Sequence, residues 1–204
     1  MATHILVNPD VITSTTFEKA FLDVAGEPAS GDVTFTVYGV DAPEARTATV
    51  KVNAQNFATS PDLFDLSAKK TALIIARTAD PTAPSTAVLR QQLGPIKEAL
   101  TIPSSNIMQG RAFNLPIGDL SGGGNLYIGN PNPSEAAVDL QYGNSSSPVH
   151  SPMTVAPTSA LKIPIAPTPI NTNLIVNVRT DSPVVVQAVI GTRFLVVYPI
   201  GPAV

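Results

Sequence analysis

Apolar and polar residues alternate along short stretches of this chain. Val33, Phe35 and Val37 are separated by threonines, and Ala136 and Val138 repeat the same spacing of two. Successive side chains of a strand point to opposite faces of its sheet, so this period predicts strands with one buried face. Similar apolar runs, each bounded by Pro, Gly or Asn, predict strands at 33–38, 47–52, 73–76, 87–89, 112–117, 126–128, 138–142, 153–155, 161–165, 174–178, 184–190 and 194–198.

Long helices are not expected, because 20 prolines and 13 glycines interrupt the chain. The run Ser60-Pro61-Asp62 predicts a cap and first turn for a short helix that carries Leu63, Phe64 and Leu66. Short connections between consecutive strands favour antiparallel pairing.

Two further segments are ambiguous or helical in pattern. Thr15 and Glu18 fit a capping box ahead of residues 17–22, which suit a short helix and a strand equally well. Residues 96–100, which follow Gly94 and Pro95, fit one helical turn.

Residues 26–80 recur loosely at 129–181. Residues 26–37 match 129–140, and residues 71–78 match 172–180. The ungapped match places Val33 on Ala136, whereas a gap that superposes Tyr38 on Tyr142 would exchange the buried and exposed faces of the strand. The pattern predicts an internal duplication, with chance similarity of two generic β segments as the alternative.

The repeat and the strand pattern together predict an all-β protein of two tandem antiparallel β-sandwich domains, jelly-roll or Ig-like. The predicted domains are residues 1–103 and 104–204, since each copy has the usual size of a domain. The core must be built from aliphatic residues, because aromatic residues make up 5% of the chain and Trp is absent.

Charge is distributed unevenly along the chain. Residues 1–112 hold 20 of the 27 charged side chains, which are 12 Lys and Arg and 15 Asp and Glu. The sparsely charged second half is compatible with packing against neighbouring subunits, since charges are depleted in interfaces. A net charge of −3 without a basic cluster argues against a nucleic-acid partner.

The sequence contains no pattern typical of catalysis or of a cofactor. Cys is absent, and His4 and His150 stand alone without the spacing of a metal site or of an active-site base. The run Ser121-Gly-Gly-Gly-Asn125 lacks the Lys-Ser/Thr ending of a phosphate-binding loop and predicts a flexible turn. We therefore expect a non-enzymatic protein with no cofactor and no metal.

A pair of Arg and Asp recurs after the same predicted strand in both halves. Arg77 precedes Asp80, and Arg179 precedes Asp181. Each pair is a candidate partner-binding site; the alternative is a turn in which Asp caps backbone amides and Arg covers the end of the strand. Tyr127, Tyr142 and Gln187 complete the candidate partner-binding residues, and Tyr127 and Tyr142 with nearby amides such as Gln141 and Asn144 could bind a carbohydrate.

The second half resembles the β-sandwich module of the sensory rhodopsin transducer family. The resemblance is carried by residues 174–187, which include the run Ser-Pro-Val-Val-Val-Gln, and by residues 126–138 with an asparagine-containing turn. It implies a compact antiparallel sandwich that oligomerises, and it carries over no functional residue.

These observations favour a structural protein that binds itself and neighbouring structural proteins. A virion component, such as a phage capsid decoration (cement) protein or a tail protein, is the expected class, and a carbohydrate- or protein-binding module is the alternative. The segment from Met1 lacks the basic and apolar regions of a signal peptide, and no apolar run approaches the length of a membrane span, so we expect a virion or cytoplasmic location without a membrane partner.

Overall fold

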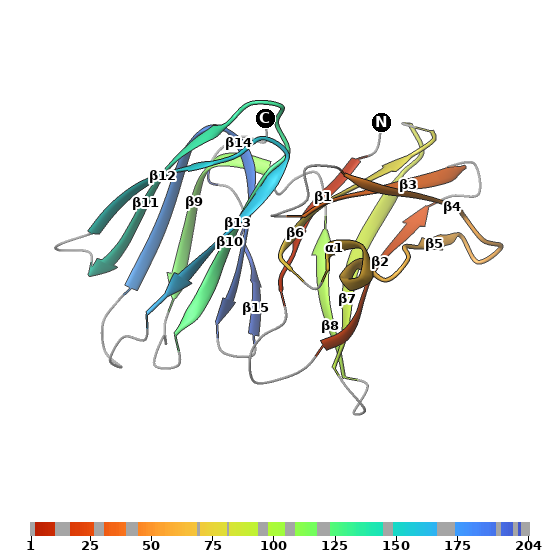
Figure 1. The fold of residues 1–204 in the computed structure, drawn as a ribbon, viewed down its shortest axis with the longest axis horizontal. Helices are drawn as coiled ribbons and strands as arrows, with labels where there is room; N and C mark the ends of the chain where they lie inside the picture. The colour runs from red at the N-terminus through yellow and green to blue at the C-terminus, as the bar shows by residue number, and fades with distance from the viewer. Residues whose placement is uncertain are drawn as a thin grey trace. The chain divides into compact units, whose positions relative to one another are not determined.

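The computed structural model describes residues 3–10, 17–26, 31–39, 45–68, 70–80, 82–93, 98–104, 109–117, 123–144, 149–166, 174–190, 193–197 and 200. These residues are almost entirely in antiparallel strands (Figure 1). The chain divides into two compact units, Met1–Asn106 and Ile107–Val204, close to the predicted boundary at residue 103. Among the described residues, no helix has the length and apolar character needed to cross a membrane.

Unit 1 consists of two four-stranded sheets with the orders β1-β6-β3-β4 and β5-β2-β7-β8. Every pair of neighbouring strands is antiparallel. The strands are β1 (Thr3–Asn8), β2 (Phe17–Gly26), β3 (Asp32–Gly39), β4 (Arg46–Lys51), β5 (Phe57–Thr59), β6 (Ala72–Thr78), β7 (Ser85–Leu93) and β8 (Glu98–Ser104).

Unit 2 forms a connected sheet in the order β12-β11-β14-β10-β13, with β9 and β15 also paired to β14. All of its neighbouring strands are likewise antiparallel. The strands are β9 (Gln109–Ile117), β10 (Gly124–Asn130), β11 (Ala136–Asn144), β12 (Val149–Val155), β13 (Ser159–Ile165), β14 (Leu174–Ile190) and β15 (Arg193–Val196).

The long strand β14 changes its partners along its length. Up to Thr180 it pairs with β11, from Val185 it pairs with β10, and from Gln187 it also pairs with β15. Strand β9 pairs with both parts, up to Arg179 and again at Val184 and Val185. The register with β9 shifts between Arg179 and Val184, which marks a bulge. The sequence pattern predicted two separate strands here, and this was wrong because the polar residues between them continue the strand through the bulge.

The two units have the same order of strand pairing. In unit 1, β6 lies between β1 and β3 while β7 lies between β2 and β8. In unit 2, the first half of β14 lies between β9 and β11. Its second half pairs with β10 on one side and, on the other, with β9 at Val184 and Val185 and then with β15 from Gln187 to Ile190. The pairs β3–β4 and β2–β5 correspond in the same way to β11–β12 and β10–β13.

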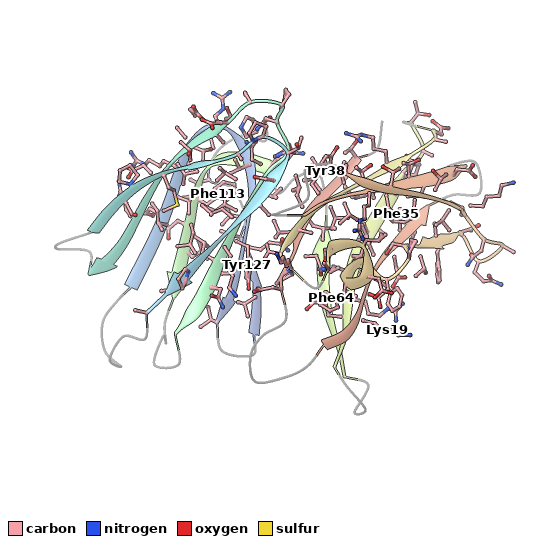
Figure 2. The ribbon with its side chains drawn as sticks, in the orientation of Figure 1. Lys19, Phe35, Tyr38, Phe64, Phe113 and Tyr127 are labelled. Atoms are coloured by element: carbon pink, nitrogen blue, oxygen red, sulfur yellow. The ribbon has the colours of Figure 1, made fainter. Side chains whose placement is uncertain are left out.

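The alternation that predicted the strands also determines the core. Val33, Phe35 and Val37 are buried on β3, as are Val138 and Leu140 on β11. Figure 2 labels several of the large buried rings, including those of Phe35, Phe64 and Phe113. In unit 2 the core continues through aliphatic residues of β9, β10, β11, β12 and β14.

The short helix forms where its cap predicted it. Helix α1 spans Leu63–Ser67, and the Asp62 side chain accepts hydrogen bonds from the amides of Phe64 and of Ala20. Leu63 and Phe64 are fully buried. The cap therefore also ties the helix to β2.

One open choice is decided and one helical interpretation is corrected. Residues 17–22 begin β2, whereas Thr15 lies outside the described residues. Residues 98–100 begin the strand β8 and form no helical turn. In both places pairing with β7 overrides a local pattern that also fits a helix.

The glycine-rich segment forms a turn only in part. Gly123 has a φ of 67°, which favours glycine. Gly124 already belongs to β10, where a Cβ atom would lie 2.7 Å from the carbonyl oxygen of Val189. Glycine therefore permits close pairing with β14 here, and residues 121 and 122 lie outside the described residues.

Asn130 is the most connected buried polar residue of unit 2. Its Nδ2 donates to the carbonyl oxygens of Ser134 (2.8 Å), Val155 (3.0 Å) and Ala156 (3.1 Å), and its Oδ1 accepts from the amide and side chain of Asn132. This one side chain joins the end of β10 to the end of β12. It is fully buried, so its loss would leave several carbonyl groups without a donor.

We expect Asn130→Asp to lower the free energy of unfolding by about 3 kcal/mol or more, because a buried carboxylate cannot donate to these carbonyls. Gln55→Glu, the corresponding change from amide to carboxylate at an exposed position, is the control and is expected to change it by about 0.5 kcal/mol or less. Urea denaturation of both variants measures the difference, and equal losses would contradict the assigned role of Asn130.

His4 is buried in unit 1, and its Nε2 lies 2.8 Å from Ser85 Oγ. Burial lowers the pKa of His4 from 6.5. The unfolded chain therefore binds a proton at a higher pH than the folded chain does. The contribution of neutral His4 is complete above pH 6.5 and is lost as the pH falls through the lower, folded pKa.

We expect the free energy of unfolding of the native chain to fall more steeply between pH 7 and pH 5 than that of His4→Phe. The reason is that only the native chain must place a charged imidazolium in the core or expose it. Chemical denaturation at several pH values measures both slopes. Parallel slopes would show that His4 does not account for this dependence.

Candidate functional site

An open face of unit 2 carries polar side chains across four strands. Register pairing places Asn114 of β9 opposite Asn177 of β14, and Asn177 opposite Gln141 of β11. The next row consists of Ala112, Arg179, Asp139 and Pro152. Directly opposed residues share a face of the sheet, so these side chains lie together. We call the set the amide face: Ala112, Asn114, Ala137, Asp139, Gln141, Pro152, Thr154, Asn177 and Arg179.

Alternation explains why this face is polar. Phe113, Leu115 and Val178, which flank the outward residues along β9 and β14, are buried on the opposite side. The outward side chains are half-buried or exposed. In unit 1 the corresponding row is Ile5, Ile75 and Thr36, so the amides are a property of unit 2.

The charges on the amide face balance. It carries the cation Arg179 and the carboxylate Asp139, which are cross-strand neighbours. Gln141 Nε2 donates to Asp139 Oδ2 at 3.1 Å. The face is therefore neutral and rich in groups that both donate and accept hydrogen bonds.

A depression of about 690 Å³ lies at the end of the amide face beside the bulge in β14. Its polar lining includes Asp139, Arg179 and Asp181, and its apolar lining includes Pro152 and Met153. It is open to solvent, whereas sites for small molecules enclose most of the ligand surface. The geometry suits contact with a protruding side chain of a partner better than capture of a small molecule.

The structure places Arg179 and Asp181 together in this depression, as two of the candidate residues. Arg179 is exposed, and Asp181 Oδ1 accepts a hydrogen bond from the Ala137 amide at 2.9 Å. Asp181 thus caps a backbone amide of β11 across the bulge. No turn separates it from the strand, because β14 is continuous through this point.

The pair in unit 1 has a different arrangement. Arg77 is half-buried on β6, opposite Thr3 and Thr34. Asp80 follows the strand and accepts from the amide and hydroxyl of Thr82, both at 2.7 Å. These bonds lower the pKa of the Asp80 carboxyl. For Asp80 the capping interpretation is confirmed.

Tyr127 and Gln187 are cross-strand neighbours on β10 and β14. Both are buried, at 0% and 3% exposure, and neither lines the depression. The prediction that they offer a partner-binding surface is therefore corrected, because both side chains are buried. Figure 2 shows Tyr127 among the strands of unit 2.

The carbohydrate site predicted around Tyr127 and Tyr142 stays a prediction. Tyr142 lies on β11, which β14 separates from β10. The side chains of Tyr142, Asn144 and His150 lie outside the described residues. Among the described residues, no group of three or more His, Asp or Glu side chains could hold a metal ion.

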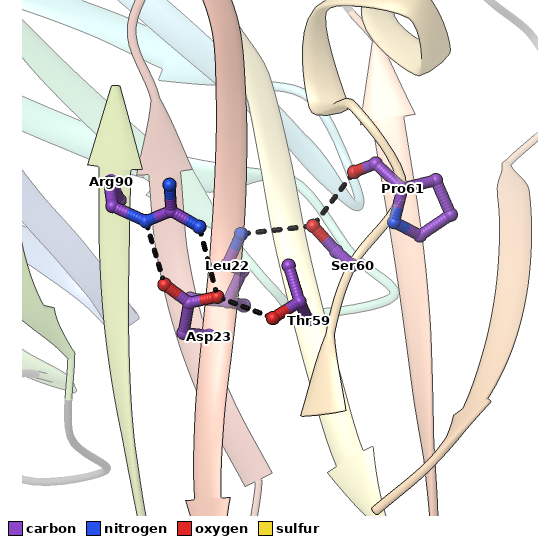
Figure 3. Close-up of polar contacts among 6 residues, drawn as sticks. All are labelled: Leu22, Asp23, Thr59, Ser60, Pro61 and Arg90. Carbon is purple, nitrogen blue, oxygen red and sulfur yellow. Dashed lines mark hydrogen bonds and ion pairs between the residues drawn. The ribbon is translucent and has the colours of Figure 1, made fainter. Parts of the chain in front are cut away.

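One polar cluster that the sequence pattern missed lies on unit 1 (Figure 3). Asp23 of β2 accepts from Arg90 Nε of β7 at 3.0 Å and from Thr59 Oγ1 of β5 at 2.7 Å. The Arg90 guanidinium also lies 5.1 Å from the centre of the Phe21 ring. The residues come from three strands, so their proximity depends on strand order and no local spacing could reveal it.

We expect this cluster to be structural and weak. Arg90 and Asp23 are 40% and 27% exposed, which screens their attraction. A double-mutant cycle with Asp23→Ala and Arg90→Ala should give a coupling of about 0.5–1 kcal/mol in unfolding free energy. Additive losses would show that the ion pair contributes nothing.

Comparisons with protein-family models, with curated proteins and with solved structures find no match to this chain.

Proposed function

We propose that the chain consists of two copies of one β-sandwich domain. The common order of strand pairing supports this. Thr78 and Thr180 support it as well, because each follows an arginine and donates its hydroxyl to the carbonyl oxygen two residues later, at 2.8 and 2.6 Å.

The register of the strands refines the predicted alignment. Val33 lies opposite Thr78, and Val138 lies opposite Thr180. Matching the two threonines places Val33 on Val138, two residues beyond Ala136. The buried face is preserved by this shift, because an even displacement keeps the alternation.

Each proposed sandwich is Ig-like in its central pairs. Strands β2 and β5 pair, as do β3 and β6, which corresponds to the B–E and C–F pairs of an Ig domain. The flanking strands differ, since β1 lies beside β6 and β7 lies beside β2. The resemblance of the second half to the sensory rhodopsin transducer-like sandwiches stays a prediction.

The function that this geometry supports best is that of a non-enzymatic structural protein that binds neighbouring subunits. A capsid decoration (cement) protein or a tail protein of a virion is the class we propose. The observation that carries the proposal is the amide face, which is neutral and consists of half-buried and exposed side chains on four strands. Such a surface can pack on another protein without burying an unpaired charge.

The alternative, a carbohydrate-binding module, has less support. Sugar rings stack on exposed aromatic side chains, and the described part of the amide face contains none. Among the described residues, the exposed aromatic side chain is Phe57, which lies on β5 of unit 1.

Light scattering over a range of concentrations tests the proposal. We expect a defined oligomer, and we expect Asn114→Lys with Asn177→Lys to weaken its association by about tenfold or more, because like charges then meet across the interface. Thr47→Lys with Thr49→Lys, a matched change at exposed positions of β4, should leave the association unchanged.

A mass of 21.2 kDa for the native chain at every concentration would remove the support for self-assembly. Equal weakening by both pairs of lysines would show that the effect comes from net charge and would move the interface away from the amide face.

A further inference from the structure

Strand β1 occupies an edge of its sheet. Among the described strands it pairs with β6 alone, through the register pairs from Thr3–Arg77 to Asn8–Ala72. Within unit 1 it is joined to the remaining strands through the connection to β2, which belongs to the other sheet. Release of β1 therefore breaks one ladder and leaves the other strand pairings of the unit intact.

Polar side chains hold β1 against the opposite sheet. His4 Nε2 lies 2.8 Å from Ser85 Oγ, and Gln91 Nε2 donates to Asn8 Oδ1 at 2.8 Å. Ser85 and Gln91 both belong to β7. His4, Asn8 and Gln91 are more than nine-tenths buried, so these contacts lie in the interior of unit 1.

This interior is incompletely paired. His4 Nδ1, Asn8 Nδ2 and Gln91 Oε1 are buried and have no hydrogen-bond partner. Among the described residues, the other such atom is Ser67 Oγ, in α1. A buried polar group without a partner loses its hydration and gains nothing in return. The orphaned atoms are thus concentrated where β1 meets β7.

Unit 2 provides an internal comparison. There the corresponding edge strand is β9, and its register with β14 places Phe113 and Ile117 where β1 has His4 and Asn8. Phe113 is buried in an apolar core, with Leu115 beside it. We call the buried contacts of His4 and Asn8 with Ser85 and Gln91 the polar seat of β1. The polar seat is specific to β1, because the same order of strand pairing in unit 2 forms without it.

We propose that β1 is exchanged between copies of this protein, so that β1 of one molecule pairs with β6 of another. This inference rests on the proposed function in assembly and names its mode of contact. The incoming strand is identical to the one that leaves, so every contact of the seat is made again between molecules. The polar and partly unpaired seat lowers the cost of release, while the His4 and Asn8 contacts preserve the register.

Disulfide trapping tests the exchange in the full-length chain, which contains no cysteine. Thr3 and Arg77 are register partners, and opposed residues of an antiparallel pair lie within the range of a disulfide. Chains carrying Thr3→Cys and differently tagged chains carrying Arg77→Cys are mixed under native conditions and then oxidised. Exchange predicts covalent dimers that contain both tags.

The control mixture combines Thr3→Cys with Thr49→Cys. Thr49 lies on β4, at the far edge of the same sheet, so it never opposes β1. We expect the yield of mixed dimers to exceed that of the control about tenfold. A yield no higher than the control overturns the exchange. If light scattering still shows an oligomer, the proposed function stands without it.

A second set of variants tests whether the polar seat is the cause of the exchange. His4→Phe, Asn8→Ile and Gln91→Leu together replace the polar seat with apolar residues, two of which copy β9. We expect mixed dimers to form about tenfold more slowly, because release of β1 no longer relieves orphaned groups. Ser67→Ala removes the orphaned hydroxyl outside the seat and should leave the rate unchanged. An equal rate in all variants would overturn the role of the polar seat.

Discussion

The structure of both units depends on how the chain crosses from the strands of one sheet to the strands of the other. In unit 1 the chain crosses through the connection between β6 and β7, which begins with Thr78 and with Asp80, the residue that caps the Thr82 amide. In unit 2 the crossing occurs without leaving the strand, through the bulge of β14. The hydroxyl of the threonine after the arginine binds a carbonyl oxygen in both, so the same local bond begins both passages.

The asparagines beside the bulge show how unit 2 stabilises this passage. Asn132 Nδ2 donates to the Pro183 carbonyl oxygen at 2.8 Å, and Asn132 is itself held by Asn130. Pro183 has no amide N–H to donate to a ladder, and at this bulge its carbonyl oxygen is bound by a side chain. The amide face begins directly beside this point. The depression at its end is lined by Arg179, Thr180 and Asp181, where the bulge of β14 begins.

The sequence predicted the parts of the fold that depend on local alternation. Val33, Phe35 and Val37 are buried as expected, and Asp62 caps a helix as expected. The sequence-based prediction failed where a segment fits both a helix and a strand and pairing with another strand decides between them, as in β8. The strand β5, with three residues, is too short to produce a pattern.

The candidate site was predicted in part, for a physical reason. Arg179 and Asp181 were proposed because they stand at the end of a predicted strand. Gln141 was named only as an amide near the two tyrosines, and Asn114 and Asn177 were not found, because each is an ordinary polar position of an alternating strand. They become a surface only when the order β9-β14-β11 is known. Without the order of the strands, Tyr127 and Gln187 were interpreted as exposed residues that bind a partner. They are register partners on β10 and β14, and both are buried.

The contrast between β1 and β9 extends this argument from fold to assembly. Under the proposed duplication, β1 and β9 occupy equivalent positions, and the buried Phe113 stands in β9 where β1 has His4, without a polar atom that needs a partner. His4 and Asn8 make the seat of β1 less stable and more selective, since a displaced register would leave still more polar groups unpaired. A strand that served only to complete unit 1 would gain from apolar residues at these positions. Polar residues are the better solution for a strand that must leave, and return in the same register to a second copy.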